Sequence, residues 1–145
     1  RLYCHEYPPP FRSGLDAGNH IVSAVSADGL DFVREPGVRI AQDSGLQSYA
    51  VYAPEVLRLG DGTYRMYYAG WSADSVEGRI FSATSGDGLE WVKDTGICLD
   101  NGGPYQESKV SEPCVARLPD GRFRMFYEAN DTSGDWRILS ATTPG

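Results

Sequence analysis

The sequence lacks a long hydrophobic run and is short of positive charge, and each shortage excludes a class of protein. No apolar segment approaches the roughly 20 residues that a membrane-spanning helix needs. The 13 Lys and Arg residues are outnumbered by 20 Asp and Glu residues, so the net charge is −7. An excess of negative charge argues against a nucleic acid or an anionic membrane as the partner.

Cysteine and histidine are also scarce. Three cysteines, Cys4, Cys98 and Cys114, are an odd number and too few for a disulfide scaffold. Their spacing fits no zinc motif, so we expect buried free thiols, and the cellular compartment stays open. With only His5 and His20 available, no catalytic triad or histidine-rich metal site can be built. We expect neither a metal nor a cofactor.

Glycine and aromatic residues are abundant instead. The chain has 17 Gly, nine Tyr, five Phe and three Trp among 145 residues. This composition favours many short strands and tight turns over long helices.

An internal repeat with a period of about 59 residues organises the chain. Residues 53–68 (APEVLRLGDGTYRMYY) and 112–127 (EPCVARLPDGRFRMFY) are identical at nine of sixteen positions. A second block recurs at 20–32, 79–91 and 137–145, with the same spacing to within one residue. Two blocks that keep one spacing indicate a repeated structural unit.

Each repeat reads as four antiparallel strands joined by tight turns. In the second repeat we expect strands at 54–59, 63–71 and 79–85, and a fourth that starts at residue 89. Asp61-Gly62 is expected to form a two-residue hairpin turn in which both residues take positive φ. Four-stranded antiparallel units of this kind are the blades of a β-propeller, so the predicted fold is all-β.

The number of repeats predicts an incomplete propeller. We expect a single partial domain with blade fragments at 1–40, 41–99 and 100–145, which is about two and a half blades. Closed propellers have about four to eight blades. The first residue is Arg1 rather than Met and both ends fall inside a blade, so we expect a fragment of a larger ring or a chain completed by a partner.

The two ends of the blades differ in their loops. The Asp-Gly turns are short and nearly identical between repeats and lie at one end. The other end carries the loops 72–78 and 131–135 and the blade connectors 41–52 and 100–111. Long, dissimilar loops on a rigid scaffold are where binding residues concentrate, so we expect function at this end.

Two carboxylates fall near the start of the innermost strands at this end. Glu55 follows the shared proline of the repeat and Glu112 precedes it, so an alternating strand would place both on one face. Such a pair could serve as acid and base in glycoside hydrolysis. The alternative is that each is a solvated carboxylate or pairs with a nearby arginine, such as Arg58 or Arg117.

Aromatic residues at the same end are candidates for binding a sugar. They are Trp71, Tyr49, Tyr52, Tyr105 and Trp136. Most aromatic residues on strands belong to the core, so we expect about two in three of these to be packing residues.

The combined pattern resembles a known superfamily. APEV followed by an Asp-Gly hairpin, RMYY and S-x-D-G-x-x-W is similar to the five-bladed propellers of glycoside hydrolase families 43, 32 and 130. The repeated segments Ser26-x-Asp28-Gly29 and Ser85-x-Asp87-Gly88 resemble a shortened Asp-box, a structural turn in which the aspartate accepts backbone N–H groups and a following aromatic residue packs between sheets. Calcium binding by Asp28 or Asp87 is not expected, because further oxygen ligands are missing nearby.

The resemblance implies roles for the two carboxylates. Glu55 matches the residue that orients the site and tunes its pKa, and Glu112 matches the general acid. Glu55 stands where Asp is usual, and Glu112 directly precedes Pro113 where one intervening residue is usual. The first-blade strand that would supply the general base is absent, so whether the chain is an active enzyme is left open.

Two functional hypotheses follow. The first is a carbohydrate-active propeller related to glycoside hydrolases, with Glu55 and Glu112 in its cleft. The second is a non-catalytic sugar-binding or assembly module. Two copies of two and a half blades sum to five, so this module would complete its propeller as a homodimer.

Overall fold

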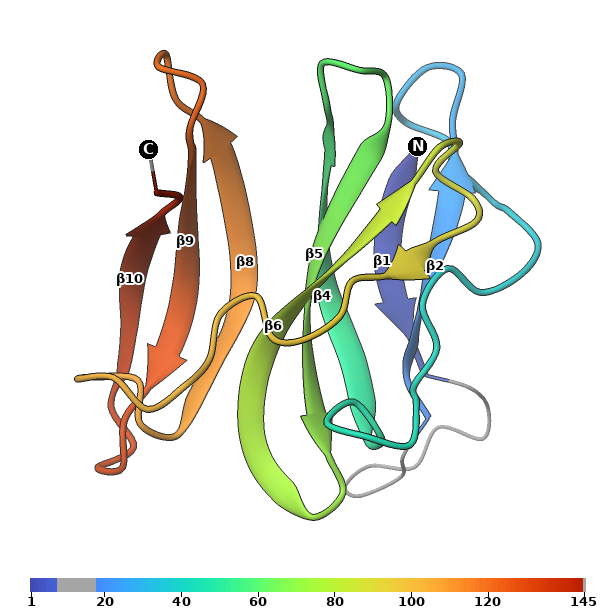
Figure 1. Cartoon of the computed structure of the whole chain (residues 1–145). Coiled ribbons are helices and arrows are strands. Elements are labelled where there is room, and N and C mark those ends of the chain that lie inside the picture. Colours follow the sequence, from blue (N-terminus) through green and yellow to red (C-terminus); the bar gives the residue numbers. More distant parts are fainter. Residues whose placement is uncertain (8–17, 145) are drawn as a thin grey trace.

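The structure, a computed structural model, describes residues 1–7 and 18–144. Within these residues ten strands form three blade-like groups and no helix occurs (Figure 1). The first blade contains β1 (Leu2–Glu6), β2 (His20–Val25) and β3 (Val33–Arg34). The second contains β4 (Ala50–Arg58), β5 (Tyr64–Ser72), β6 (Ser75–Ser85) and β7 (Val92–Lys93). The third contains β8 (Lys109–Arg117), β9 (Phe123–Asn130) and β10 (Trp136–Thr142).

The blades are antiparallel, and a single parallel contact joins two of them. Strand order is β1-β2-β3 in the first blade, and antiparallel neighbours run β4-β5-β6-β7 and β8-β9-β10 in the others. Gly78 of β6 and Lys109 of β8 form the parallel bridge between the second and third blades. The all-β architecture of propeller blades, predicted from the repeat, is confirmed.

The Asp-Gly turns differ from the predicted type. Gly62 has a φ of 89°, whereas Asp61 is not in the positive-φ region. The Leu59 carbonyl accepts from the Gly62 amide at 3.1 Å, and the Leu59 amide donates to the Thr63 carbonyl at 2.8 Å. The expectation of positive φ at both residues was wrong, because the loop is one residue longer and ends in a glycine bulge.

The Ser-x-Asp-Gly segments form the expected hydrogen-bonded turns. Asp28 Oδ1 accepts from the Leu30 and Asp31 amides at 2.9 and 3.1 Å, and Asp87 repeats this arrangement. These bonds lower the pKa of Asp28 to about 2. An aromatic residue follows each turn. In the second blade it is Trp91, which packs against the core, and in the first blade it is Phe32, which is exposed.

Several sequence expectations require correction. Two strands of the second blade, β4 and β6, begin earlier than predicted, at Ala50 and Ser75. The fourth strand of this blade begins later than predicted and consists only of Val92–Lys93. The three cysteines, expected to be buried, are all exposed as free thiols. Cys114 is exposed because it alternates along β8 with Pro113 and Val115, whose side chains are buried.

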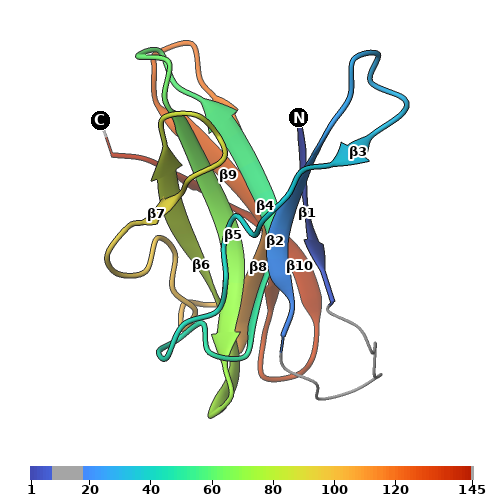
Figure 2. The same cartoon turned by 90° about the vertical axis from the view of Figure 1, so that its right-hand side faces the viewer.

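Two hydrophobic clusters hold the blades together. One lies between the first and second blades and includes Ile21, Val51 and Tyr68. The other lies between the second and third blades and includes Ile80, Val110 and Tyr127. Innermost strand β4 contacts both β1 and β8, so the three blades meet along it (Figure 2).

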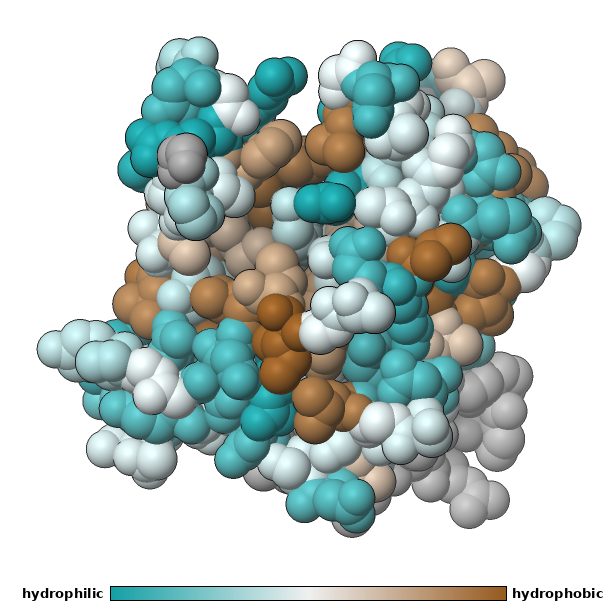
Figure 3. All heavy atoms as spheres, in the orientation of Figure 1, coloured by the Kyte–Doolittle hydropathy of each residue, from teal (hydrophilic) through white to brown (hydrophobic). Residues whose placement is uncertain are grey.

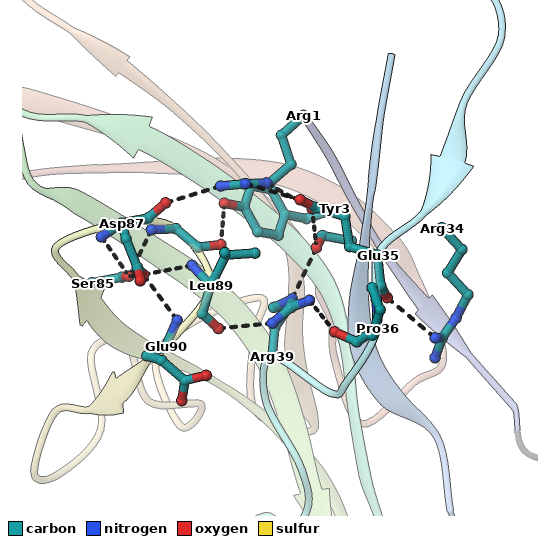
Figure 4. A network of polar contacts seen from close by, with 12 residues as sticks. Arg1, Tyr3, Arg34, Glu35, Pro36, Arg39, Ser85, Asp87, Leu89 and Glu90 are labelled. Atoms are coloured by element: carbon teal, nitrogen blue, oxygen red, sulfur yellow. Dashed lines mark hydrogen bonds and ion pairs between the residues drawn. The ribbon is translucent and has the colours of Figure 1, made fainter.

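The two blade junctions differ at one position of the repeat, which is Arg39 at the first junction and Cys98 at the second. Arg39 is buried at the first junction, where it donates to Ser23 Oγ at 2.8 Å, the Leu89 carbonyl at 3.0 Å and the Pro36 carbonyl at 2.6 Å (Figure 4). Its counterpart 59 residues later is Cys98, which lines an apolar cavity of about 210 Å³ at the second junction. Apolar side chains gather in the hollow between these two blades (Figure 3).

The blades have two distinct ends. The end that carries the Asp-Gly turns is called the turn end here, and the end that carries the connectors 42–49 and 101–108 is called the loop end. Among the described residues no helix is long and apolar enough to cross a membrane.

Candidate functional site

The innermost strands β4 and β8 begin side by side at the loop end and share the same irregularity. Each has a register shift against its partner, between Tyr52 and Glu55 in β4 and between Ser111 and Cys114 in β8. At the centre of each shift one residue has a φ of 50°, Ala53 in β4 and Glu112 in β8. These two residues occupy the same position in successive repeats. A left-handed backbone costs a residue with a side chain about 1–2 kcal/mol. Bulges of this kind redirect side chains beside functional sites.

The bulges change how the two predicted carboxylates are related. Glu112 occupies the bulge position, whose counterpart is Ala53, whereas the counterpart of Glu55 is Cys114. The predicted common face rested on uninterrupted alternation along the strand. That premise was wrong, because the extra residue in each bulge breaks the alternation.

Glu55 and Glu112 have different surroundings. Glu55 is half-buried, lies in a cleft with Arg1, Tyr3 and Arg58, and places Oε1 3.5 Å from the Val115 amide. Glu112 is exposed. Among the described residues no ion pair joins either carboxylate to an arginine, so the pairing with Arg58 or Arg117 is not formed.

Beside Glu112, three aromatic rings surround the ammonium group of Lys109. Lys109 Nζ lies 5.5 Å from the ring centre of Tyr52 and 5.2 Å from the rings of Trp71 and Trp136. These distances are in the range of cation–π interactions. We call this arrangement of Tyr52, Trp71, Trp136 and Lys109 the Lys109 cage. It draws on four strands, β4, β5, β8 and β10.

Burial and charge act in opposite directions on Lys109. Burial among the rings lowers the pKa of its ammonium group, and the carboxylates of Glu128 and Glu112 partly oppose this. Burial likewise raises the pKa of the Tyr52 hydroxyl, which the same two carboxylates raise further and the neighbouring Ser111 hydroxyl lowers. The cage and the two glutamates therefore form one electrostatic unit.

Several polar atoms around the cage are buried. Tyr52 Oη, Trp71 Nε1 and Ser111 Oγ are closed off from solvent within the part of the chain described, and the hydroxyls of Tyr52 and Ser111 lie close enough to interact with each other. Buried polar groups in native proteins are almost always paired, with protein, water or ligand.

The structure brings together most of the predicted aromatic residues. Tyr52, Trp71 and Trp136 meet in the cage, and Tyr49 contacts Trp71 edge to face at 5.6 Å. Trp136 is 52% exposed. Tyr105 is not part of the cage and instead lies 5.0 Å from the guanidinium of Arg137.

Sequence reasoning missed Lys109 and Glu128, although the repeat contains a signal for both. The counterpart of Lys109 is Ala50, and that of Glu128 is Ala69. The repeats also differ at the position of Trp136, whose counterpart in the second repeat is Gly78. These three differences between the repeats lie at the cage and are a signal that could have pointed to it.

The described residues provide no obvious metal site. No group of three or more His, Cys, Asp or Glu side chains among them is arranged to hold a metal ion.

Comparisons with known proteins agree with this fold. No protein-family model matches the chain. Two uncharacterised proteins of Mycobacterium tuberculosis are each 32% identical to it, over 130 and 117 residues. These alignments cover 86% and 78% of this chain but only 42% and 37% of the relatives. The chain thus spans about two fifths of the length of the curated relatives it matches.

Similar solved structures are glycoside hydrolases. A thermostable family-43 glycoside hydrolase superposes with a TM-score of 0.69 at 20% identity, covering 86% of this chain and 42% of that one. Fructan 1-exohydrolase IIa from Cichorium intybus gives a TM-score of 0.71 at 15% identity, covering 94% and 29%. An α-L-arabinofuranosidase from Lactobacillus brevis gives 0.64 at 16% identity, covering 89% and 42%. The chain therefore has the fold of part of a glycoside hydrolase β-propeller.

Proposed function

We propose that this chain contributes the general acid and part of the sugar-binding surface of a glycoside hydrolase built on a five-bladed propeller. The observation that supports the proposal best is the position of Glu112. It stands at a strained bulge of an innermost strand, beside three aromatic rings at the loop end. Aromatic faces that stack on sugar rings next to a carboxylic acid suit the cleavage of a glycosidic bond.

The chemistry assigns a proton transfer to Glu112. The protonated carboxyl gives its proton to the glycosidic oxygen as the bond between that oxygen and the anomeric carbon breaks. Water supplies the new hydroxyl at the anomeric carbon and loses a proton to a general base. Glu55 takes the orienting role that the family resemblance implies.

The general base is not among the residues described. The resemblance assigns it to the innermost strand of the first blade. In the part of the chain that the structure describes, β1 pairs only with β2, so the first blade has no counterpart of β4. Catalysis by this chain therefore depends on a base contributed from elsewhere.

Replacing the acid tests the proposal. In a protein that also supplies the general base, and on a panel of aryl glycosides, Glu112→Gln should lower kcat about 100-fold or more on poor leaving groups, because these need the proton. Activated leaving groups should lose much less. The matched control is Glu90→Gln, an exposed glutamate at the turn end, which should keep full turnover. An equal loss on good and poor leaving groups would contradict the role of Glu112 as the acid.

A second candidate, a non-catalytic sugar-binding module that dimerises to complete its ring, is favoured by one observation. Phe126 and Ile138 on the outer face of the third blade are 43% and 71% exposed. Their counterparts one repeat earlier, Tyr67 and Ile80, pack against the third blade and are only 7% and 0% exposed. Carbohydrate binding without turnover, together with a dimeric mass in light scattering, would support this candidate over the enzyme.

A further inference from the structure

The ammonium group of Lys109 differs in its surroundings from that of the other lysine. The chain has two lysines, and Lys93 pairs with Asp43 at 2.9 Å. Lys109 makes no ion pair or hydrogen bond with any residue in the described ranges and rests only on aromatic rings. The carboxylates of Glu128 and Glu112 are near enough to raise its pKa but form no ion pair with it. A half-buried cation without a directly paired anion is costly, and a bound anion would offset that cost.

The fold makes specific room for Lys109. A Cβ atom at Gly78 would lie 2.5 Å from Lys109 Cγ and 3.2 Å from the Val110 carbonyl oxygen. The parallel bridge between Gly78 and Lys109 fixes the stem of the lysine at this junction. Only glycine at position 78 allows the lysine stem to pass this close to β6.

The buried polar groups around the cage can all donate hydrogen bonds. Trp71 Nε1 can only donate, and the hydroxyls of Tyr52 and the fully buried Ser111 can each donate one hydrogen bond. A lysine ammonium adds donors and no acceptor. This set suits a ligand group that only accepts hydrogen bonds, which is the character of an ionised carboxylate.

We propose that Lys109 determines substrate specificity by binding the carboxylate of an acidic sugar, so that the substrate class is a uronic-acid-containing saccharide. The inference rests on the proposed glycoside hydrolase function. Exposed Trp136 offers a ring face on which the sugar stacks, and Lys109 pairs with the carboxylate of that sugar. Glu128 and Glu112 are the nearby carboxylates whose negative charge opposes that of the ligand.

The test measures the reactivity of the two lysines in the intact chain. Trace labelling with acetic anhydride, followed by peptide mapping, reports Lys109 and Lys93 separately. Oligogalacturonate and glucuronate-containing oligosaccharides should slow labelling of Lys109 about tenfold at saturation, since a charge-assisted bond to the amine must break first. Labelling of Lys93 should not change.

Matched ligands distinguish the alternatives. The same oligosaccharides after reduction of their carboxyl groups are neutral and should leave Lys109 reactive. Equal protection by acidic and neutral sugars, or protection by neither, would overturn the proposal. Protection by inorganic phosphate as strong as that by the acidic sugars would also overturn it, because the anion would then not need to be carried by a sugar.

Variants separate this inference from the proposed function. Calorimetry on Lys109→Met should show about a tenfold loss of affinity for the acidic oligosaccharides, whereas Lys109→Arg should retain a preference for acidic over neutral sugars. Lys93→Met is the control and should bind as the parent does. If Glu112→Gln abolishes turnover of neutral glycosides while acidic sugars never protect Lys109, the hydrolase proposal stands and the specificity proposal falls.

Discussion

Gly78 is the residue on which the junction between the second and third blades depends most closely. Its missing side chain leaves the space that Lys109 Cγ fills, and its backbone bridges to β8. The third repeat has Trp136 in the corresponding place and uses that ring to cover the same lysine. One small and one large residue at the same repeat position thus build the two sides of the cage.

Adding a single methyl group at Gly78 should therefore disturb both stability and site. We expect Gly78→Ala to lower the free energy of unfolding by about 1–3 kcal/mol, because β6 and β8 must separate or the lysine stem must move. Urea unfolding measures the change. The matched control is Gly60→Ala, where an added Cβ meets nothing within 4 Å and φ is not positive. Equal stabilities of the two variants would contradict the close packing of Gly78 against Lys109.

At the level of single residues, the sequence predicted which aromatic residues lie at the loop end but not how they are arranged. Trp71, Tyr52 and Trp136 were expected at the loop end, and they meet there. Lys109 was not expected, because its role depends on rings from three other strands and no local pattern marks it. The bulges were also unforeseen, since Ala53 and Glu112 are not residues that prefer positive φ.

Local sequence patterns predicted which segments form strands and turns, whereas the first and last residues of each strand depend on tertiary contacts. The Asp-Gly segments mark every β4–β5-type hairpin because glycine accepts the positive φ that the turn requires. β6 begins at Ser75, four residues earlier than predicted, because it pairs with β5 as far as Ser72. Only the neighbouring strand determines that extension, and the sequence of β6 does not.

The outer face of the third blade is an element whose exposure can be tested. If a second copy of the chain covers this face, light scattering at tens of micromolar should give twice the monomer mass. Replacing Phe126 and Ile138 with serine should return the mass to that of a monomer, because both apolar side chains lie on this face. A monomer in the parent chain, or a dimer that the double substitution leaves intact, would rule out this mode of assembly.

As a whole molecule, the chain is a set of consecutive propeller blades, and the residues of the proposed site gather at one end. The repeat predicted this architecture because each blade buries its neighbour, so one spacing governs turns, strands and core together. The proposed position of the site follows from the loops, which are long and dissimilar at the loop end. The substrate could not be predicted in the same way, since the cage forms only when two blades pack together.

The three tryptophans allow the central claim, a carbohydrate site at the Lys109 cage, to be tested in one measurement. Trp71 and Trp136 belong to the cage, whereas Trp91 packs against Tyr3 at the turn end with ring centres 5.7 Å apart. Proton–nitrogen NMR resolves the indole N–H signal of each during titration with a panel of neutral and acidic oligosaccharides. We predict that a binding sugar shifts the signals of Trp71 and Trp136 and leaves that of Trp91 unchanged. A panel that moves none of the three signals, or moves only that of Trp91, would contradict the account.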